Sequence, residues 1–198
     1  MPVIDHLDLG AADLAAAEAF YAALGVSGLV RVRAAETAPT GFEGFTLSFV
    51  LAQPGDVDML VERALNAGAT SLKPAKKSLW GYGAAFQAPD GTVCTVASSS
   101  KKDTAPATGR VDDVVLQLGV ADVAATKRFY ADRGFTVAKS FGRKYAELDT
   151  GPVTLTLNKP GDLAKAVGVS ADGTDPARLV IHGDAGSFTD PDGFVWSA

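Results

Sequence analysis

Hydrophobic and polar positions alternate in several short runs along the chain, and this alternation predicts β-strands. The runs lie at residues 3–9, 27–35, 45–53, 71–74, 80–87 and 92–98, and later at 136–142, 143–150, 151–158 and 177–183. Apolar residues recur at helical spacing after Asp13, Asp56 and Asp122, whose carboxylates are expected to cap the helices. A shorter helix is predicted at 161–168, before a turn-rich loop at 169–177. The order of elements predicts a mixed α and β fold.

The sequence also repeats itself. Residues 7–25, LDLGAADLAAAEAFYAALG, align with residues 116–134, LQLGVADVAATKRFYADRG, with eleven identities in nineteen positions. Each half ends near a Pro-Asp-Gly turn, at 89–91 and at 191–193. The duplication predicts a first half at 1–98 and a second half at 111–198, abbreviated near its C-terminal end, with a polar linker at 99–110.

In the first half, a strand carrying His6 leads into a helix with the pair Phe20-Tyr21, and a Trp-Gly segment with a Pro-Asp-Gly hairpin ends the half. These motifs, taken in order, resemble the vicinal-oxygen-chelate superfamily, the group of glyoxalases, bleomycin resistance proteins and extradiol dioxygenases. The resemblance covers nearly the whole chain, as two shortened copies. It implies an α+β fold of tandem βαβββ modules, in which curled mixed sheets form a cup for a small ligand and the helices lie outside.

The first half has little room for the two middle strands of a module between Ala35 and Phe45. The resemblance therefore leaves two arrangements open: the halves form separate cups, or they complete one another's sheets. The chain is expected to be a monomer with internal pseudo-symmetry or a homodimer.

The resemblance implies that metal-using relatives hold a divalent ion with His and Glu side chains. These side chains come from the first strand and from strands near the end of each module. His6 stands at the first-strand position. The corresponding positions elsewhere fall on Val115, Thr95 and Ser197, which are poor ligands for such an ion. We therefore expect no metal at the family position and no other cofactor.

Two groups of residues are candidates for chemistry or binding. The alternation predicts that His6 and Asp8 share one face of the first strand with Ile4. On the opposite face it predicts Val3, Leu7 and Leu9. A hydrogen bond between Asp8 and His6 would make His6 a general base near neutral pH, and His182 would complete a three-ligand metal set if one cup held all three. The candidate ligand-binding residues, on polar or aromatic strand faces, are Trp80, Tyr82, Gln117, Thr46, Ser48 and His182.

For Trp80 and Tyr82 two interpretations stay open, because aromatic side chains on one face of a strand either pack under a helix or form a wall of the cup. Thr154 and Thr156 lie on a similar polar register and are further candidates to line the cup.

The composition and charge of the chain limit the kinds of partner that it is expected to bind. The net charge of −5 argues against nucleic acid, whose phosphates need a basic face. No apolar run of 18 residues predicts a membrane helix, the N-terminus lacks the pattern of a signal peptide, and the single cysteine, Cys94, lies in an apolar run. We expect a cytoplasmic protein whose partner is a small molecule.

Three functions remain open. The favoured one is a binding protein that holds a small organic ligand in the cup without a metal. The second is a lyase, isomerase or dioxygenase that uses His6, with or without a divalent ion. The third is an assembly component whose cup is filled by its own side chains.

Overall fold

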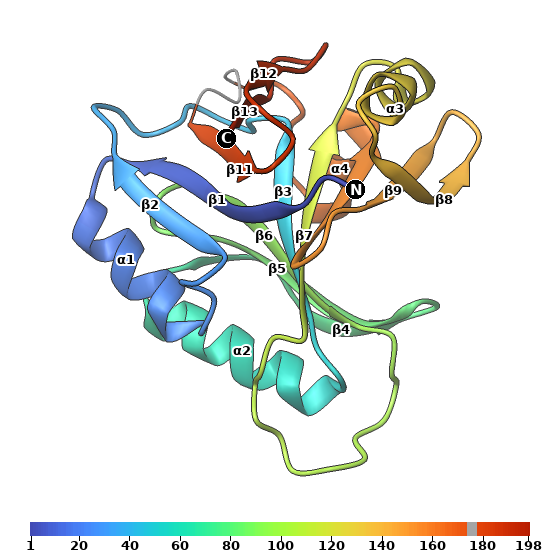
Figure 1. Cartoon of the computed structure of the whole chain (residues 1–198). Coiled ribbons are helices and arrows are strands. Elements are labelled where there is room, and N and C mark those ends of the chain that lie inside the picture. Colours follow the sequence, from blue (N-terminus) through green and yellow to red (C-terminus); the bar gives the residue numbers. More distant parts are fainter. Residues whose placement is uncertain (174–177) are drawn as a thin grey trace.

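The computed structural model describes residues 1–173 and 178–198, which fold into two mixed β-sheets with helices against them (Figure 1). The elements of the first half are β1 (Ile4–Ala11), α1 (Leu14–Ala23), β2 (Val30–Ala34), β3 (Phe45–Val50), α2 (Pro54–Asn66), β4 (Thr70–Ser78), β5 (Gly81–Gln87) and β6 (Val93–Ser98). Those of the second half are β7 (Asp113–Gly119), α3 (Val123–Ala131), β8 (Thr136–Phe141), β9 (Tyr145–Asp149), β10 (Val153–Asn158), α4 (Pro160–Val167), β11 (Leu179–Gly183), β12 (Phe188–Thr189) and β13 (Val195–Ser197).

The eight-stranded sheet contains two complete βαβββ modules, one from each half. Its strand order is β4-β5-β6-β3-β7-β10-β9-β8. One module is β3, α2, β4, β5 and β6, and the other is β7, α3, β8, β9 and β10. The first strands of the two modules, β3 and β7, pair antiparallel at the centre. The sheet is therefore a joint product of both halves.

The five-stranded sheet is a shortened version of the same plan, with the order β12-β13-β11-β1-β2. Its centre is again an antiparallel pair, β1 with β11. In each complete module the last strand lies parallel beside the first, as β6 beside β3 and β10 beside β7. Here β13 has that place beside β11, and β2 has it beside β1. The halves thus complete one another's sheets, and the α+β fold of βαβββ modules is confirmed.

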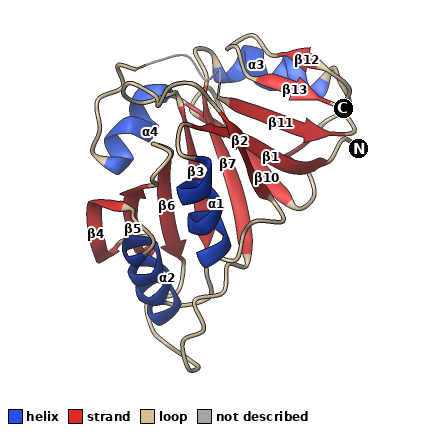
Figure 2. Cartoon of the chain, turned by 90° about the vertical axis from the view of Figure 1, so that its left-hand side faces the viewer, coloured by secondary structure: helices blue, strands red, loops and turns tan. Residues whose placement is uncertain are grey.

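The helices follow the duplication. Asp13 accepts a hydrogen bond from the Ala16 amide, and Asp122 accepts two from the following turn, so both predicted caps are confirmed. α1 and α2 lie next to each other, while α3 lies beside β12 and β13 (Figure 2). None of the helices formed by the described residues has the length and apolar character needed to cross a bilayer.

The structure corrects the predicted place of Ile4 and the predicted cap of α2, and two further predicted segments extend beyond the described residues. Ile4 is buried in the core with Leu7 and Leu9 rather than sharing the face of His6, because the pairing of β1 with β11 shifts register between Ile4 and His6. Gln53, not Asp56, is the N-cap of α2. The predicted loop at 169–177 and the predicted strand at 177–183 include positions among 174–177, which lie outside the described residues.

Asp56 instead anchors the linker. Its carboxylate accepts hydrogen bonds from the amides of Thr108 (2.5 Å) and Gly109 (2.9 Å), while the Gln53 side chain accepts one from the Thr104 amide (2.8 Å). Burial opposes the charged form of Asp56, but the hydrogen bonds from Thr108 and Gly109 outweigh it and lower the pKa of this carboxyl group. The segment 99–110 is therefore held against the start of α2.

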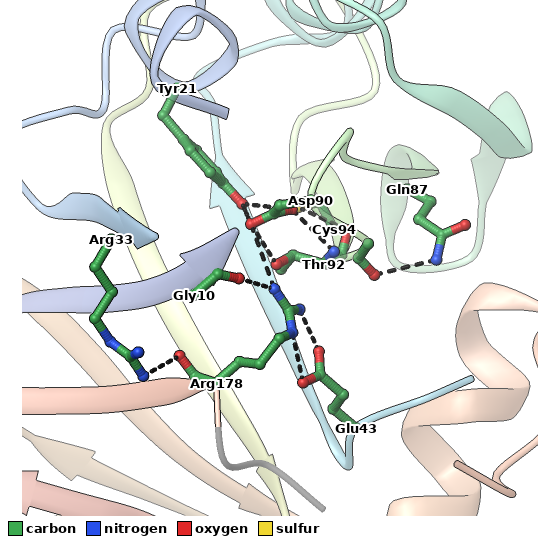
Figure 3. Close-up of polar contacts among 10 residues, drawn as sticks. Gly10, Tyr21, Arg33, Glu43, Gln87, Asp90, Thr92, Cys94 and Arg178 are labelled. Carbon is green, nitrogen blue, oxygen red and sulfur yellow. Dashed lines mark hydrogen bonds and ion pairs between the residues drawn. The ribbon is translucent and has the colours of Figure 1, made fainter. Parts of the chain in front are cut away.

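A buried ion pair ties the end of the chain to its beginning (Figure 3). The Arg178 guanidinium donates to the Glu43 carboxylate from two nitrogens, with Nε 2.8 Å from Oε1, and also to the carbonyl oxygen of Gly10. The carboxylate of Asp90 lies 4.0 Å from the same guanidinium and accepts a hydrogen bond from the buried Tyr21 hydroxyl (3.1 Å). Arg178 therefore joins β1, β11, the loop before β3 and the first Pro-Asp-Gly turn.

We predict that Arg178→Ala lowers the free energy of unfolding by about 3–5 kcal/mol, because it leaves the carboxylate of Glu43 buried without its cation. Urea denaturation measures this value. The matched control is Arg110→Ala, which breaks a largely exposed pair with Asp112 and should change stability by less than about 1 kcal/mol.

The loss should depend on pH in a defined direction. Burial raises the pKa of Glu43, and Arg178 offsets part of that rise. Without Arg178 the folded-state pKa rises further above the unfolded value, so the folded state binds the proton more tightly and the loss shrinks as the pH falls. Equal losses for Arg178→Ala and Arg110→Ala at neutral pH would contradict this account.

Candidate functional site

One face of the eight-stranded sheet carries a cavity of about 350 Å³. Its lining comes from five neighbouring strands and consists of Ser48, Val50, Asp113, Val115, Gln117, Lys139, Tyr145, Glu147, Thr154 and Thr156. Residues two apart on a strand share a face, and the register places Val115 beside Ser48 on one side and Thr154 on the other. The alternation of the sequence thus builds the cavity.

Most polar groups of this cavity already have partners. The Thr46 hydroxyl donates to the Gln117 side-chain oxygen at 2.7 Å. Thr154 donates to Asp113 (3.2 Å), and Asn158 donates to the Thr156 hydroxyl (2.9 Å). Among the described contacts, Ser48 makes no side-chain hydrogen bond, although it is largely buried. Its hydroxyl is therefore available to a ligand.

Charged groups gather at the β8–β9 side. The Lys139 ammonium lies 3.1 Å from the Glu147 carboxylate, which also accepts a hydrogen bond from the Tyr145 hydroxyl (2.8 Å). Burial and the neighbouring Glu147 raise the pKa of Tyr145 well above its ordinary value. Burial also raises the pKa of Asp113, against the Thr154 hydrogen bond. The cavity thus offers two carboxyl groups, one ammonium and a phenol that stays protonated.

A second cavity, of about 430 Å³, adjoins this face on the β4–β6 side. Ser48 and Thr95 are register partners on β3 and β6, so the two cavities lie on one continuous surface. Gly83, Ala85 and Ala97 provide a floor of small residues. Trp80 stands at the rim, 85% exposed, in the turn before β5. It extends this face towards solvent rather than packing in the core.

α4 covers part of the same surface. Its apolar residues Leu163 and Val167 pack with Ala85 and Val93. In the last turn of α4, the carbonyl oxygens of Lys165 (3.0 Å) and Ala166 (2.6 Å) accept hydrogen bonds from the Lys73 ammonium. The face is thus partly filled by the chain itself, while the cavity around Ser48 stays open.

Tyr82, the other aromatic candidate, lies on the opposite side of the sheet. Its hydroxyl donates to Asp58 on α2 at 2.7 Å. Phe86, four residues further along the strand and on the same face, is buried in the core. The helix therefore covers this aromatic face, and Tyr82 is separated from the cavities.

The two histidines meet on the five-stranded sheet. His6 on β1 and His182 on β11 are direct register partners, and their rings stack with centroids 4.5 Å apart. Asp8 lies 3.2 Å from Nε2 of His182, and one nitrogen of Arg31 lies 3.3 Å from Nε2 of His6. One ligand atom each of His6, Asp8 and His182 lies within 4.8 Å of the others.

The pairing inside this cluster differs from the expected one. Asp8 bonds His182, whereas His6 contacts Arg31. Partial burial, then Arg31, then His182 lower the pKa of His6, because each disfavours the imidazolium. A guanidinium only donates, so Nε2 of a neutral His6 is the acceptor. The cluster therefore contains a neutral His6 facing a cation.

Sequence reasoning missed Arg31, Lys139, Tyr145 and Glu147. Arg31 lies on the alternating run VRVRA, and Tyr145 and Glu147 lie on RKYAELD, where they share one face. Lys139 lies on TVAKSF, where simple alternation groups it with Val137 and Phe141, so no polar alternation marks it. The alternation signals the face, but which strands become neighbours depends on pairing between distant segments.

No protein-family model matches the sequence, and no curated protein matches it. Solved structures do match in fold. Glyoxalase I from Zea mays superimposes with a TM-score of 0.63 at 16% identity, over 99% of this chain and 91% of that one. A putative dioxygenase from Bacillus subtilis gives 0.60 at 10% identity, over 98% and 83%. The chain therefore shares the fold of glyoxalase I and of this putative dioxygenase.

We predict that the imidazole of His6 titrates below 6.5 and that Arg31→Gln raises its pKa, because the substitution removes a nearby positive charge. An NMR titration of the imidazole C–H signals measures this, and with two histidines in the chain the assignment is simple. Arg110→Gln, a surface control, should leave the curve unchanged. A wild-type His6 that titrates above 6.5 would rule out the described electrostatics.

Proposed function

We propose that this protein binds a small polar organic molecule in the cavity around Ser48, on the eight-stranded sheet, and does so without a metal ion. The observation that supports this is the cavity itself: a concave site of about 350 Å³, lined by convergent polar groups, on the sheet with two complete modules. Sites with a few oriented polar groups in a concave pocket are typical of small-molecule binding.

The lining also indicates the ligand chemistry. Asp113 and Glu147 offer carboxyl groups, Lys139 is the one cationic lining residue, and Ser48 has an uncommitted hydroxyl. These groups suit a neutral or cationic ligand rich in hydroxyl or amine groups. The small-residue floor beside Thr95 gives room for an apolar part. No imidazole or thiolate lies among the described lining residues, so recognition would depend on hydrogen bonds.

We predict that Ser48→Ala weakens ligand binding three- to tenfold, the effect of about one lost hydrogen bond. The ligand would come from an NMR screen of small polyols, hydroxy acids and amines, scored by shifts of the Ser48 and Gln117 amides. Ser71→Ala is the matched control, because Ser71 lies on the same sheet but outside both cavities. No hit in the screen, or equal weakening by both variants, would refute the proposal.

A second candidate function is a metal-dependent lyase, isomerase or dioxygenase centred on the five-stranded sheet. The observation that favours it is the convergence of His6, Asp8 and His182, three side chains of two suitable ligand types, on one surface. The Arg31 guanidinium 3.3 Å from His6 works against it, because a bound cation would face that charge. This arrangement makes it the less favoured of the two.

Metal titration separates the candidates. The favoured proposal predicts no stoichiometric binding of Zn²⁺, Mn²⁺, Fe²⁺ or Ni²⁺ by calorimetry, and the same result for His182→Asn. One equivalent bound by the wild type and lost in both His182→Asn and Asp8→Asn would establish the second candidate. Asp5→Asn, on the same strand, is the control for lost charge.

A further inference from the structure

The two sheets end in four edge strands, and β2 differs from the other three. β12 is two residues long. β4 contains a proline and two register shifts against its neighbour, and β8 contains one shift. β2 pairs with β1 through five consecutive residues without a shift. Prolines, irregularities and charged side chains are means by which proteins block edge pairing. Of these, β2 has only the charges of Arg31 and Arg33, which disfavour a basic partner but not an acidic one.

The open edge of β2 presents backbone groups for a further strand. The backbone hydrogen bonds between β2 and β1 use alternate residues of the β2 segment. The first is accepted by the carbonyl of Leu29, and the last is donated by the amide of Ala35. The amides and carbonyls of the residues between, Val32 and Ala34, therefore point away from β1. No other described strand lies on that side.

A groove of about 440 Å³ runs along this edge between β2 and α1. Val30 and Val32 line it from the side of β2 that faces α1, and Arg31 lines it from the opposite side. A space that touches both faces of one strand lies along the strand's edge. Ala22 adds an apolar wall from α1, and Glu18 an acidic one.

We propose that β2 takes up an extended, acidic segment of another protein as a sixth strand of the sheet. The unpaired backbone groups require an extended main chain. On the face away from α1, the exposed Arg31 would lie opposite one side chain of the added strand and within reach of those two residues before and after it. Cross-strand pairs of opposite charge are stabilising. On the face of α1, next to Val30 and Glu18, the intervening side chains would be apolar.

A second copy of this chain fits the same edge poorly. Antiparallel pairing of two β2 strands about Val32 would set Arg31 of one copy opposite Arg33 of the other. Like charges directly opposite each other are destabilising. The segment recognised is therefore expected to alternate apolar and acidic residues, a pattern complementary to VRVRA.

The test measures, by fluorescence anisotropy, the binding of a fluorescein-labelled nonapeptide of alternating valine and glutamate to the 198-residue chain. We expect saturable binding at least tenfold tighter than that of the valine and lysine nonapeptide, and weaker at high salt. Val32→Pro, which removes an outward amide, should abolish binding, whereas Val32→Ala, which keeps that amide, should retain it. In the wild type, the amides of Val32 and Ala34 should gain protection from hydrogen exchange when the peptide binds.

Several outcomes overturn the proposal. These are absence of saturable binding, equal affinity for the two peptides, and exchange protection that appears elsewhere but not at Val32 and Ala34. Analytical ultracentrifugation tests the alternative that a second copy of the chain occupies the edge. A wild-type dimer that Val32→Pro dissociates would assign the edge to that second copy instead. The hydrogen-exchange result does not depend on the proline variant and so stands even if that variant misfolds.

Discussion

The antiparallel pairing of β1 with β11 brings residues near the start of the chain beside residues near its end and forms the centre of the five-stranded sheet. Partners such as Leu7 and Ile181 are far apart in sequence, so the pairing must offset a large loss of chain entropy. Both of these side chains are fully buried, and Arg178, just before β11, forms its ion pair with Glu43 inside the protein. The same pairing sets His6 opposite His182.

This construction separates two features that the family resemblance places in a single cup. The eight-stranded sheet carries the cavity of about 350 Å³, and its central strands place Ser48, Val115 and Gln117 there rather than metal ligands. The shortened five-stranded sheet has the imidazoles, but β2 brings Arg31 beside them. Each complete module of the other sheet has two more strands beyond this position. Among the described residues no strand lies beyond β2, so β2 forms an open edge that carries Arg31.

The sequence predicted the elements well and their pairing poorly. Local signals, such as the caps Asp13 and Asp122, suffice for helices because each cap bonds within its own turn. Polar alternation placed Ser48 and Gln117 on one face of their strands, and the structure brings both to one cavity. The contact of Asp8 with His182 rather than His6, the role of Arg31 and the inward Ile4 all depend on which strands become neighbours, which no local pattern encodes.

The most direct measurement is a crystal structure of the protein soaked with its best-binding small polyol or amine and supplied with Zn²⁺, with anomalous data collected at the zinc edge. The account predicts electron density for the organic molecule against Ser48 and Gln117, and no anomalous peak in that cavity or between the histidines. An empty cavity, with an anomalous peak about 2.1 Å from the imidazole nitrogens of His6 and His182, would contradict it.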